Sequence, residues 1–169
     1  MHTDNKGHSS DADRMFRQIG GSLKGKNKVI LVHGNADMDA VGSAYAVAEC
    51  FPPAKIYAPD GIDRVAKMVM DKLGAEVVTE CDISDHELVV IVDTSSPEQF
   101  GQGFPEIPEG SIVIDHHRPT GKWDHLRLVC DETKVSCCEL IYEILRASDI
   151  GIGRNVGLAL LSGMLTDSG

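Results

Sequence analysis

The stretch Val29-Ile30-Leu31-Val32-His33-Gly34-Asn35-Ala36-Asp37-Met38-Asp39 decides the fold of this chain. Its first four residues form a short apolar run rich in β-branched side chains, which is typical of a strand buried on both faces. Polar residues follow at once, and the Ala- and Val-rich segment from Asp39 to Phe51 predicts a helix that ends at Pro52-Pro53. A buried strand followed by polar residues and a helix is the basic unit of an α/β sheet.

This unit recurs along the chain. Further strands are expected at 55–57, 76–78, 88–92, 111–114 and 126–129, and helices at 62–73, 136–147 and 153–165. Strands that alternate with helices predict an α/β fold with a mostly parallel β-sheet, flanked by helices on both faces. Residues 1–25 are expected to form a lead with one short helix, capped by Ser10 and ended by Gly20-Gly21. Residues 26–169 are expected to form the main domain.

Length and composition narrow the class of protein. The chain has 169 residues and a formal net charge of −10, which suits one globular domain. Its longest uncharged apolar run, Val156 to Thr166, is shorter than the roughly 20 residues of a membrane span. The N-terminus lacks the apolar segment of a signal peptide. Five cysteines without a Cys-x-x-Cys pair indicate reduced thiols, so we expect a cytoplasmic protein without a membrane partner.

The acidic net charge also limits which ligands the protein can bind. A net charge of −10 argues against a broad basic surface for nucleic acid. It leaves a nucleotide or phosphate substrate possible, because divalent metal ions reverse the local field of an acidic cleft.

Three of the expected strands run directly into residues that can bind metals. Because ligands bind at the carboxyl ends of the strands in open α/β sheets, these side chains are expected along one edge of the sheet. They are His33, Asp37 and Asp39 after the first strand, Asp93 after residues 88–92, and Asp115, His116 and His117 after residues 111–114.

Each of these elements has a simpler explanation when it is taken alone. Asp37 or Asp39 could cap the following helix, Asp93 could be a turn residue, and the histidine pair could be packed or solvated. Together, however, so many carboxylates and imidazoles need a cationic partner. Mixed carboxylate and imidazole ligands suit manganese, magnesium or zinc, while the absence of thiolates disfavours a structural zinc site. Asp167 fits the same pattern, because a carboxylate after an apolar helix opposes the helix dipole.

Four segments resemble the motifs of the DHH phosphoesterase family, in order and with family-like spacing. The segment from His33 to Ser43 resembles the first motif, and Val92-Asp93-Thr94-Ser95 resembles the second. Ile114-Asp115-His116-His117-Arg118-Pro119 is similar to the motif that names the family. The segment from Gly163 to Gly169 matches the fourth.

This resemblance implies a catalytic domain with two divalent metal ions, usually manganese, with magnesium as the other possibility. It implies that His33, Asp37 and Asp93 hold one ion. Asp39, Asp93, His116 and Asp167 would hold the other, with Asp93 bridging the two. Asp115 would orient its neighbours, His117 would contact the scissile phosphate, and Arg118 is a further candidate phosphate ligand. Activation of water by two metal ions needs no covalent nucleophile.

Two features of the sequence point to different branches of the family. Gly42-Ser43 resembles the RecJ-like, oligonucleotide-degrading exonuclease branch, whereas Asp115-His116-His117-Arg118 also occurs in the pyrophosphatase-like branch. The expected substrate is a small nucleotide or a short single-stranded oligonucleotide, with inorganic pyrophosphate as the alternative. The family's C-terminal substrate-binding domain is expected to be absent from this chain, which leaves a non-catalytic metal-binding regulatory module as another alternative. A dinucleotide-binding domain is disfavoured, because acids stand after the first strand where a phosphate would bind.

Overall fold

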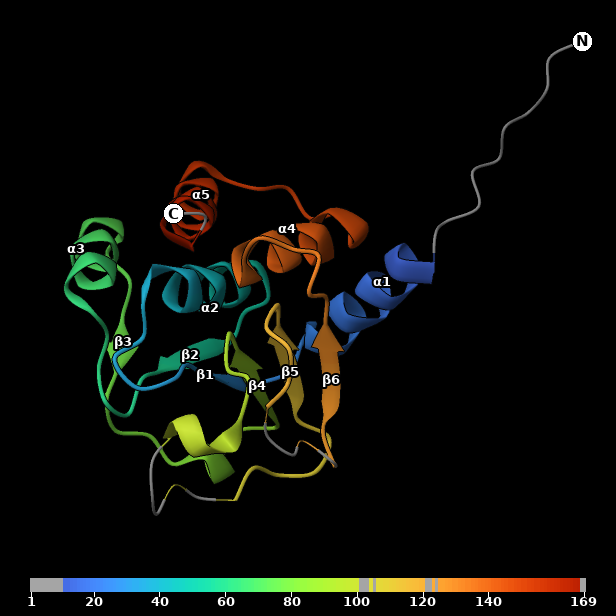
Figure 1. The fold of residues 1–169 in the computed structure, drawn as a ribbon, viewed down its shortest axis with the longest axis horizontal. Helices are drawn as coiled ribbons and strands as arrows, with labels where there is room; N and C mark the ends of the chain where they lie inside the picture. The colour runs from blue at the N-terminus through green and yellow to red at the C-terminus, as the bar shows by residue number, and fades with distance from the viewer. Residues whose placement is uncertain (1–10, 101–103, 105, 121–122, 124, 168–169) are drawn as a thin grey trace, which may run out of the picture.

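The computed structural model describes residues 11–100, 104, 106–120, 123 and 125–167. Six parallel strands form one sheet in the order β3-β2-β1-β4-β5-β6 (Figure 1). Their bounds are β1 Lys28–Leu31, β2 Ala54–Tyr57, β3 Val77–Val78, β4 Leu88–Val92, β5 Ile112–Asp115 and β6 Arg127–Cys130. The α-helices are α1 Asp11–Leu23, α2 Met38–Cys50, α3 Arg64–Leu73, α4 Cys137–Ala147 and α5 Arg154–Asp167. The predicted α/β class with a parallel sheet is confirmed.

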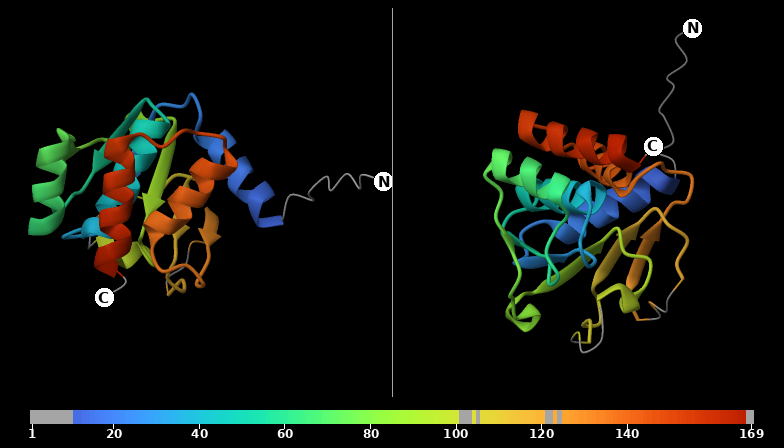
Figure 2. Two further views of the ribbon diagram at one scale, coloured as in Figure 1. Left: turned by 90° about the horizontal axis from the view of Figure 1, so that it is seen from above. Right: turned by 60° about the vertical axis from the view of Figure 1, so that its left-hand side comes forward.

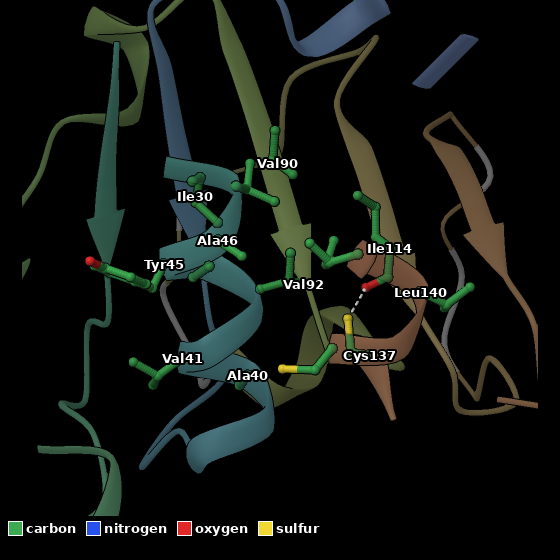
Figure 3. Packing of buried hydrophobic residues seen from close by; sticks show 14 of the residues in the cluster. Ile30, Ala40, Val41, Tyr45, Ala46, Val90, Val92, Ile114, Cys137 and Leu140 are labelled. Carbon is green, nitrogen blue, oxygen red and sulfur yellow. Dashed lines mark hydrogen bonds between the residues drawn. The ribbon is translucent and has the colours of Figure 1, made fainter. Parts of the chain in front are cut away.

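The two faces of the sheet are covered differently. All five α-helices contribute to one apolar cluster with the side chains on one face of the strands, such as Ile30 and Val90 (Figures 2 and 3). On the opposite face, where helices were also expected, the cover consists of two short 3-10 helices, Ile83–Asp85 and Pro97–Phe100, and irregular segments. The connection from β4 to β5, residues 93–111, contains the 3-10 helix Pro97–Phe100 and, among its described residues, no α-helix.

Helix α1 corrects one expectation from the sequence. It continues through Gly20 and Gly21 to Leu23, so the glycine pair does not end it. A Cβ on Gly20 would overlap the hydroxyl of Ser148, just beyond α4. The glycine therefore allows α1 and α4 to approach closely, and tertiary packing outweighs its low helix propensity. Ser10, the expected cap, lies outside the described residues.

Helix α5 packs closely against α2 because both helices have a glycine at the contact. A Cβ on Gly42 in α2 would lie 2.8 Å from the carbonyl oxygen of Ala159. A Cβ on Gly163 in α5 would overlap the sulfur of Cys138 and lie 3.1 Å from the Cα of Asp39. This close contact brings the C-terminal end of α5, with Asp167, to the carboxyl ends of the strands (Figure 2).

Two further expectations from the sequence concern the state of the cysteines and the presence of a membrane-spanning helix. All five cysteines are free thiols, and the buried Cys137 donates its S–H to the carbonyl of Ile114 at 3.3 Å (Figure 3). Among the described residues, no helix combines the length and apolar character needed to cross a bilayer.

The glycine contact between α2 and α5 can be tested by substitution. We expect Gly163→Ala to lower the free energy of unfolding by about 1–3 kcal/mol, because the added methyl group overpacks the contact with Cys138 and Asp39. Gly157→Ala is the matched control on the same helix, since its Cβ would meet only Ile152, at 3.6 Å. The control should be neutral or stabilising, by up to about 1 kcal/mol. Urea denaturation of both variants measures the difference, and equal effects would contradict this account of the packing.

Candidate metal centre

The predicted site residues lie where the strand order reverses. Strands β2 and β3 lie on one side of β1, whereas the later strands β4, β5 and β6 lie on its other side. Open α/β sheets bind ligands at such a switch point, at the carboxyl ends of the strands. His33 follows β1, and Asp93 directly follows β4. Asp115 is the last residue of β5, with His116 and His117 after it. The backbone of Asp93 has a φ of +52°, a left-handed conformation that aspartate tolerates better than most residues.

Asp37 has two roles at the start of α2. It is the N-cap, and its Oδ1 accepts hydrogen bonds from the backbone N–H groups of Asp39 (3.0 Å) and Ala40 (3.1 Å). The helix-cap interpretation is therefore correct for Asp37. The same carboxylate also lies in a cluster with His33 and Asp93, whose ligand atoms are all within 4.8 Å of one another.

Asp39 is buried and held by a different helix. Its Oδ2 accepts from the backbone N–H of Cys137 at 2.7 Å, and its Oδ1 accepts from that of Cys138 at 2.8 Å. These are the first two residues of α4, so the carboxylate satisfies free N–H groups at a helix N-terminus, where negative charge is favoured. The side chain is only 1% exposed.

His116 lies among three carboxylates. Its Nε2 is 3.3 Å from Asp167, 3.6 Å from Asp39 and 3.6 Å from Asp93. On the other side of the ring, Nδ1 lies 3.3 Å from the carbonyl oxygen of Lys134. Because a carbonyl can only accept, Nδ1 donates there, and Nε2 is left to face the carboxylates.

His33 and His117 approach Asp93 from two other directions. The Nε2 of His33 is 3.8 Å from Asp93, while its Nδ1 lies 3.0 Å from the carbonyl of Gly34. The Nδ1 of His117 is 3.4 Å from Asp93 and 3.0 Å from Asp115, which also accepts from the backbone N–H of His117. The side chain of His117 is 54% exposed, whereas that of Asp93 is 4% exposed.

Two buried atoms in the middle of this arrangement have the character of metal ligands. Asp93 Oδ1 and His116 Nε2 are shielded from solvent and have no hydrogen-bond partner among the described residues. Unpaired buried polar atoms are costly, and a divalent cation accepts both a carboxylate oxygen and an imidazole nitrogen. The donor set therefore fits the metal ions that the sequence predicts.

Burial and the close approach of these groups shift the pKa values of the cluster in both directions. Burial and the charge of Asp93 raise the pKa of Asp39 to about 6. Burial also raises the pKa of Asp93, but attraction by the nearby imidazoles of His117 and His33 outweighs it and brings the value to about 2. The nearby carboxylate of Asp93 raises the pKa of His117 to about 9, with Asp115 contributing against the effect of burial. Metal binding must then release protons.

Comparison with known proteins agrees with this arrangement. Residues 27–164 match the DHH family, N-terminal domain. The chain belongs to the DHH family. An uncharacterised protein of Methanocaldococcus jannaschii is 33% identical over 153 residues, which are 86% of this chain and 46% of that protein.

Two further relatives of this DHH chain are more distant. A protein of Streptococcus mutans, named a probable manganese-dependent inorganic pyrophosphatase, is 25% identical over 83% of this chain and 47% of its own length. A solved structure of an exopolyphosphatase-related protein from Bacteroides fragilis has a TM-score of 0.73 at 16% identity, covering 92% of this chain and 50% of that chain. That similarity shows a common fold. The DHH chain spans about half the length of the curated relatives described above.

The structure brings together all six predicted metal ligands and two further predicted residues, but not Arg118. Arg118 is exposed, and among the described residues its guanidinium has no ion pair within 4 Å. The eight residues in the cluster are His33, Asp37, Asp39, Asp93, Asp115, His116, His117 and Asp167. Their roles as ligands and catalytic groups remain predictions.

The groups that orient the side chains of Asp39 and His116 could not be predicted from the sequence. These groups are backbone atoms: the N–H groups of Cys137 and Cys138 and the carbonyl of Lys134. Because backbone atoms are common to every residue type, sequence carries only an indirect signal. That signal is the Ser136-x-x-Glu139 pattern, which is typical of a helix N-terminus.

The pKa of His117 gives a direct test of the electrostatics in the DHH chain. In the metal-free protein, we expect His117 to titrate at about 9, and Asp93→Asn to bring its pKa toward the ordinary 6.5. Because the folded-state pKa is raised, protonated His117 stabilises the metal-free fold below pH 6.5. This contribution is lost as the pH rises through about 9.

NMR titration of the histidine Cε1–H resonances measures this pKa. Diamagnetic Mg²⁺ should lower it, because a cation near Asp93 replaces the proton as the counter-charge. A wild-type His117 that titrates near 6.5 without metal would contradict the assigned contacts.

Proposed function

We propose that this chain carries the metal centre of a hydrolase that cleaves phosphodiester or phosphomonoester bonds in small nucleotides or short oligonucleotides. The observation that carries the proposal is the overlap of the ligand clusters around Asp93, with unpaired buried atoms between them. Membership of the DHH family supports a phosphoesterase, and the name of the Streptococcus mutans relative, which specifies manganese, supports that metal.

Two divalent ions fit the donor atoms. His33, Asp37 and Asp93 would hold one ion, and Asp39, Asp93, His116 and Asp167 would hold the other. Such ions, when bound, make water a nucleophile at neutral pH and neutralise charge on phosphoryl oxygens. Four of these ligands are also held by the backbone. Asp37 and Asp39 accept from backbone N–H groups, and His33 and His116 lie against backbone carbonyls.

His117 is suited to contact the substrate. It is the most exposed imidazole of the cluster. When cations bind Asp93, the contact of Nδ1 with Asp115 at 3.0 Å still favours the protonated ring. Its Nδ1 donates to Asp115, so Nε2 remains free to donate to a phosphoryl oxygen or to the leaving oxygen. Asp115 is a positioning residue, because it holds both the ring and the backbone N–H of His117.

Charge favours a small substrate over a long nucleic acid. With a net charge of −10, the chain repels an extended polyanion, and only the immediate vicinity of bound cations attracts phosphate. Arg118 is exposed beside His117 and can add one contact to a phosphate group at the rim of the site.

Inorganic pyrophosphate is the second candidate substrate. The observation that favours it is the relative from Streptococcus mutans, whose name specifies that activity. Pyrophosphate is compact and highly charged, so two cations and one protonated imidazole can neutralise it without a large binding surface.

Turnover with manganese separates these possibilities. A short oligoribonucleotide, a nucleoside 3′,5′-bisphosphate and pyrophosphate are offered separately, and Asp93→Ala is the control. Activity on one of the first two that is lost in the control supports the proposal, and activity on pyrophosphate alone supports the second candidate. If the chain binds two ions but turns over none of the three substrates, the result favours a non-catalytic metal-binding module.

Metal stoichiometry tests the ligands independently of activity. Asp93 clusters with His33 and Asp37 and also lies 3.6 Å from His116, so Asp93→Ala should abolish binding of both ions, whereas Asp167→Ala should remove only one. Asp71→Ala is the matched control, because Asp71 is an exposed acid on α3 that pairs with Lys67. Isothermal titration with Mn²⁺ measures the number of sites. Binding of two ions by Asp93→Ala would contradict the assignment.

His117→Ala should separate metal binding from catalysis. We expect it to keep both ions, because Asp93, His33 and His116 retain their positions, and to lower kcat by about 10²–10⁴-fold as a lost proton donor. Manganese titration and steady-state kinetics on the same preparation measure the two effects. Loss of an ion in this variant would show instead that His117 is a metal ligand.

A further inference from the structure

The turn between β6 and α4, residues 131–136, touches the metal centre at one peptide group. The carbonyl of Lys134 accepts from Nδ1 of His116 at 3.3 Å. The N–H of the same peptide group, on Val135, donates to Oε2 of Glu139 at 2.9 Å. One carboxylate on α4 therefore connects to the imidazole of His116 through a single planar peptide.

The planarity of this peptide links its two hydrogen bonds. In a trans peptide the N–H and C=O point in opposite directions and rotate together. A carboxylate that fixes the N–H of Val135 therefore also fixes the direction of the Lys134 carbonyl. It also polarises the peptide, which makes the carbonyl oxygen a stronger acceptor.

The rest of the turn is built to support this geometry. Asp131 accepts from the backbone N–H and the hydroxyl of Thr133 through Oδ1, and its carbonyl accepts from the N–H of Lys134. Ser136 caps α4 by accepting from the N–H of Glu139 at 3.1 Å. Glu139 thus lies in the first turn of α4, where its side chain reaches back to the peptide.

We propose that Glu139 is a positioning residue for the metal centre. Its carboxylate orients and polarises the Lys134–Val135 peptide, which holds Nδ1–H of His116 and directs Nε2 toward Asp39, Asp93 and Asp167. Metal-bound histidines commonly donate their other N–H to a carboxylate or carbonyl that tunes their affinity. Here the carboxylate acts through an intervening peptide.

The chain offers a matched control for a purely structural role. Glu143 lies one turn further along α4, and it shares with Glu139 an ion pair to the ammonium group of Lys134, at 3.8 Å against 3.1 Å. Glu143 also pairs with Arg146 at 2.8 Å. Among the described residues, the carboxylate of Glu143 pairs with the side chains of Lys134 and Arg146 and makes no hydrogen bond to the Lys134–Val135 peptide. Removing Glu143 therefore disturbs the ion pairs of α4 and leaves the link to His116 in place.

The test compares Glu139→Ala, Glu139→Gln and Glu143→Ala in the full chain. The solvent-exchange rate of the His116 Nδ1 proton is measured by NMR without metal and with Mg²⁺, and Mn²⁺ affinity is measured by titration. Glu139→Ala should speed proton exchange and weaken Mn²⁺ binding by about tenfold, within the range known for groups behind a metal ligand. Glu143→Ala should leave both values within about twofold of the wild type.

The glutamine variant covers the case in which Glu139→Ala fails to fold. Its amide oxygen can still accept from Val135, so Nδ1 should stay protected from exchange, while loss of the charge shifts its proton resonance upfield. Unchanged exchange and affinity in Glu139→Ala, or equal effects of Glu139→Ala and Glu143→Ala, would overturn the inference. So would an unchanged resonance in Glu139→Gln.

The inference rests on the proposed metal-dependent function for its effect on affinity. The two can fail separately. If the wild type binds neither Mn²⁺ nor Mg²⁺, the proposed function fails, while proton exchange in the metal-free protein still decides whether Glu139 holds His116.

Discussion

The contact between the buried carboxylate of Asp39 and the N-terminus of α4 is the interaction on which the site depends. Asp39 lies in the first turn of α2, directly after its cap Asp37, and accepts from the N–H groups of Cys137 and Cys138. A bare carboxylate at this depth is strongly disfavoured, but two charge-assisted hydrogen bonds and the positive end of a helix stabilise it. The same contact joins the beginning of the sheet to the last third of the chain and sets the distance between Asp39 and His116.

Around this contact, negative charge is concentrated without a matching positive side chain. Burial and the charge of Asp93 raise the pKa of Asp39 to about 6, and the nearby carboxylate of Asp93 raises that of His117 to about 9. The protonated imidazole of His117 therefore partly balances this charge from the margin of the cluster. A divalent cation would balance it better, because its charge would lie between the carboxylates.

Much of the fold and most of the candidate site could be predicted from the sequence, because both depend on local patterns. Strands β1, β4 and β5 are apolar runs, and each is followed by acids or histidines within a few residues. Local patterns could not show that Gly20 lies inside α1, since the reason is the nearby Ser148. Nor could they show why Asp167 reaches His116, because the glycine contact between α2 and α5 sets that distance. Tertiary packing determines both the length of α1 and the position of Asp167. In a single sequence, the only trace of such packing is a glycine, which by itself indicates the end of a helix.

The exposure of the cluster divides its residues into two kinds. Asp39, Asp93 and His116 are nearly inaccessible. Backbone contacts hold Asp39 and His116, and they leave Nε2 of His116 facing the centre. His117 lies on the same loop as His116, but more than half of its side chain is exposed, and its contact to Asp115 leaves Nε2 open to solvent. Buried atoms suit ions, which need fixed distances, and an exposed donor suits a substrate that must enter and leave. The two adjacent histidines thus have different surroundings, because the backbone after β5 turns one ring inward and the other toward solvent.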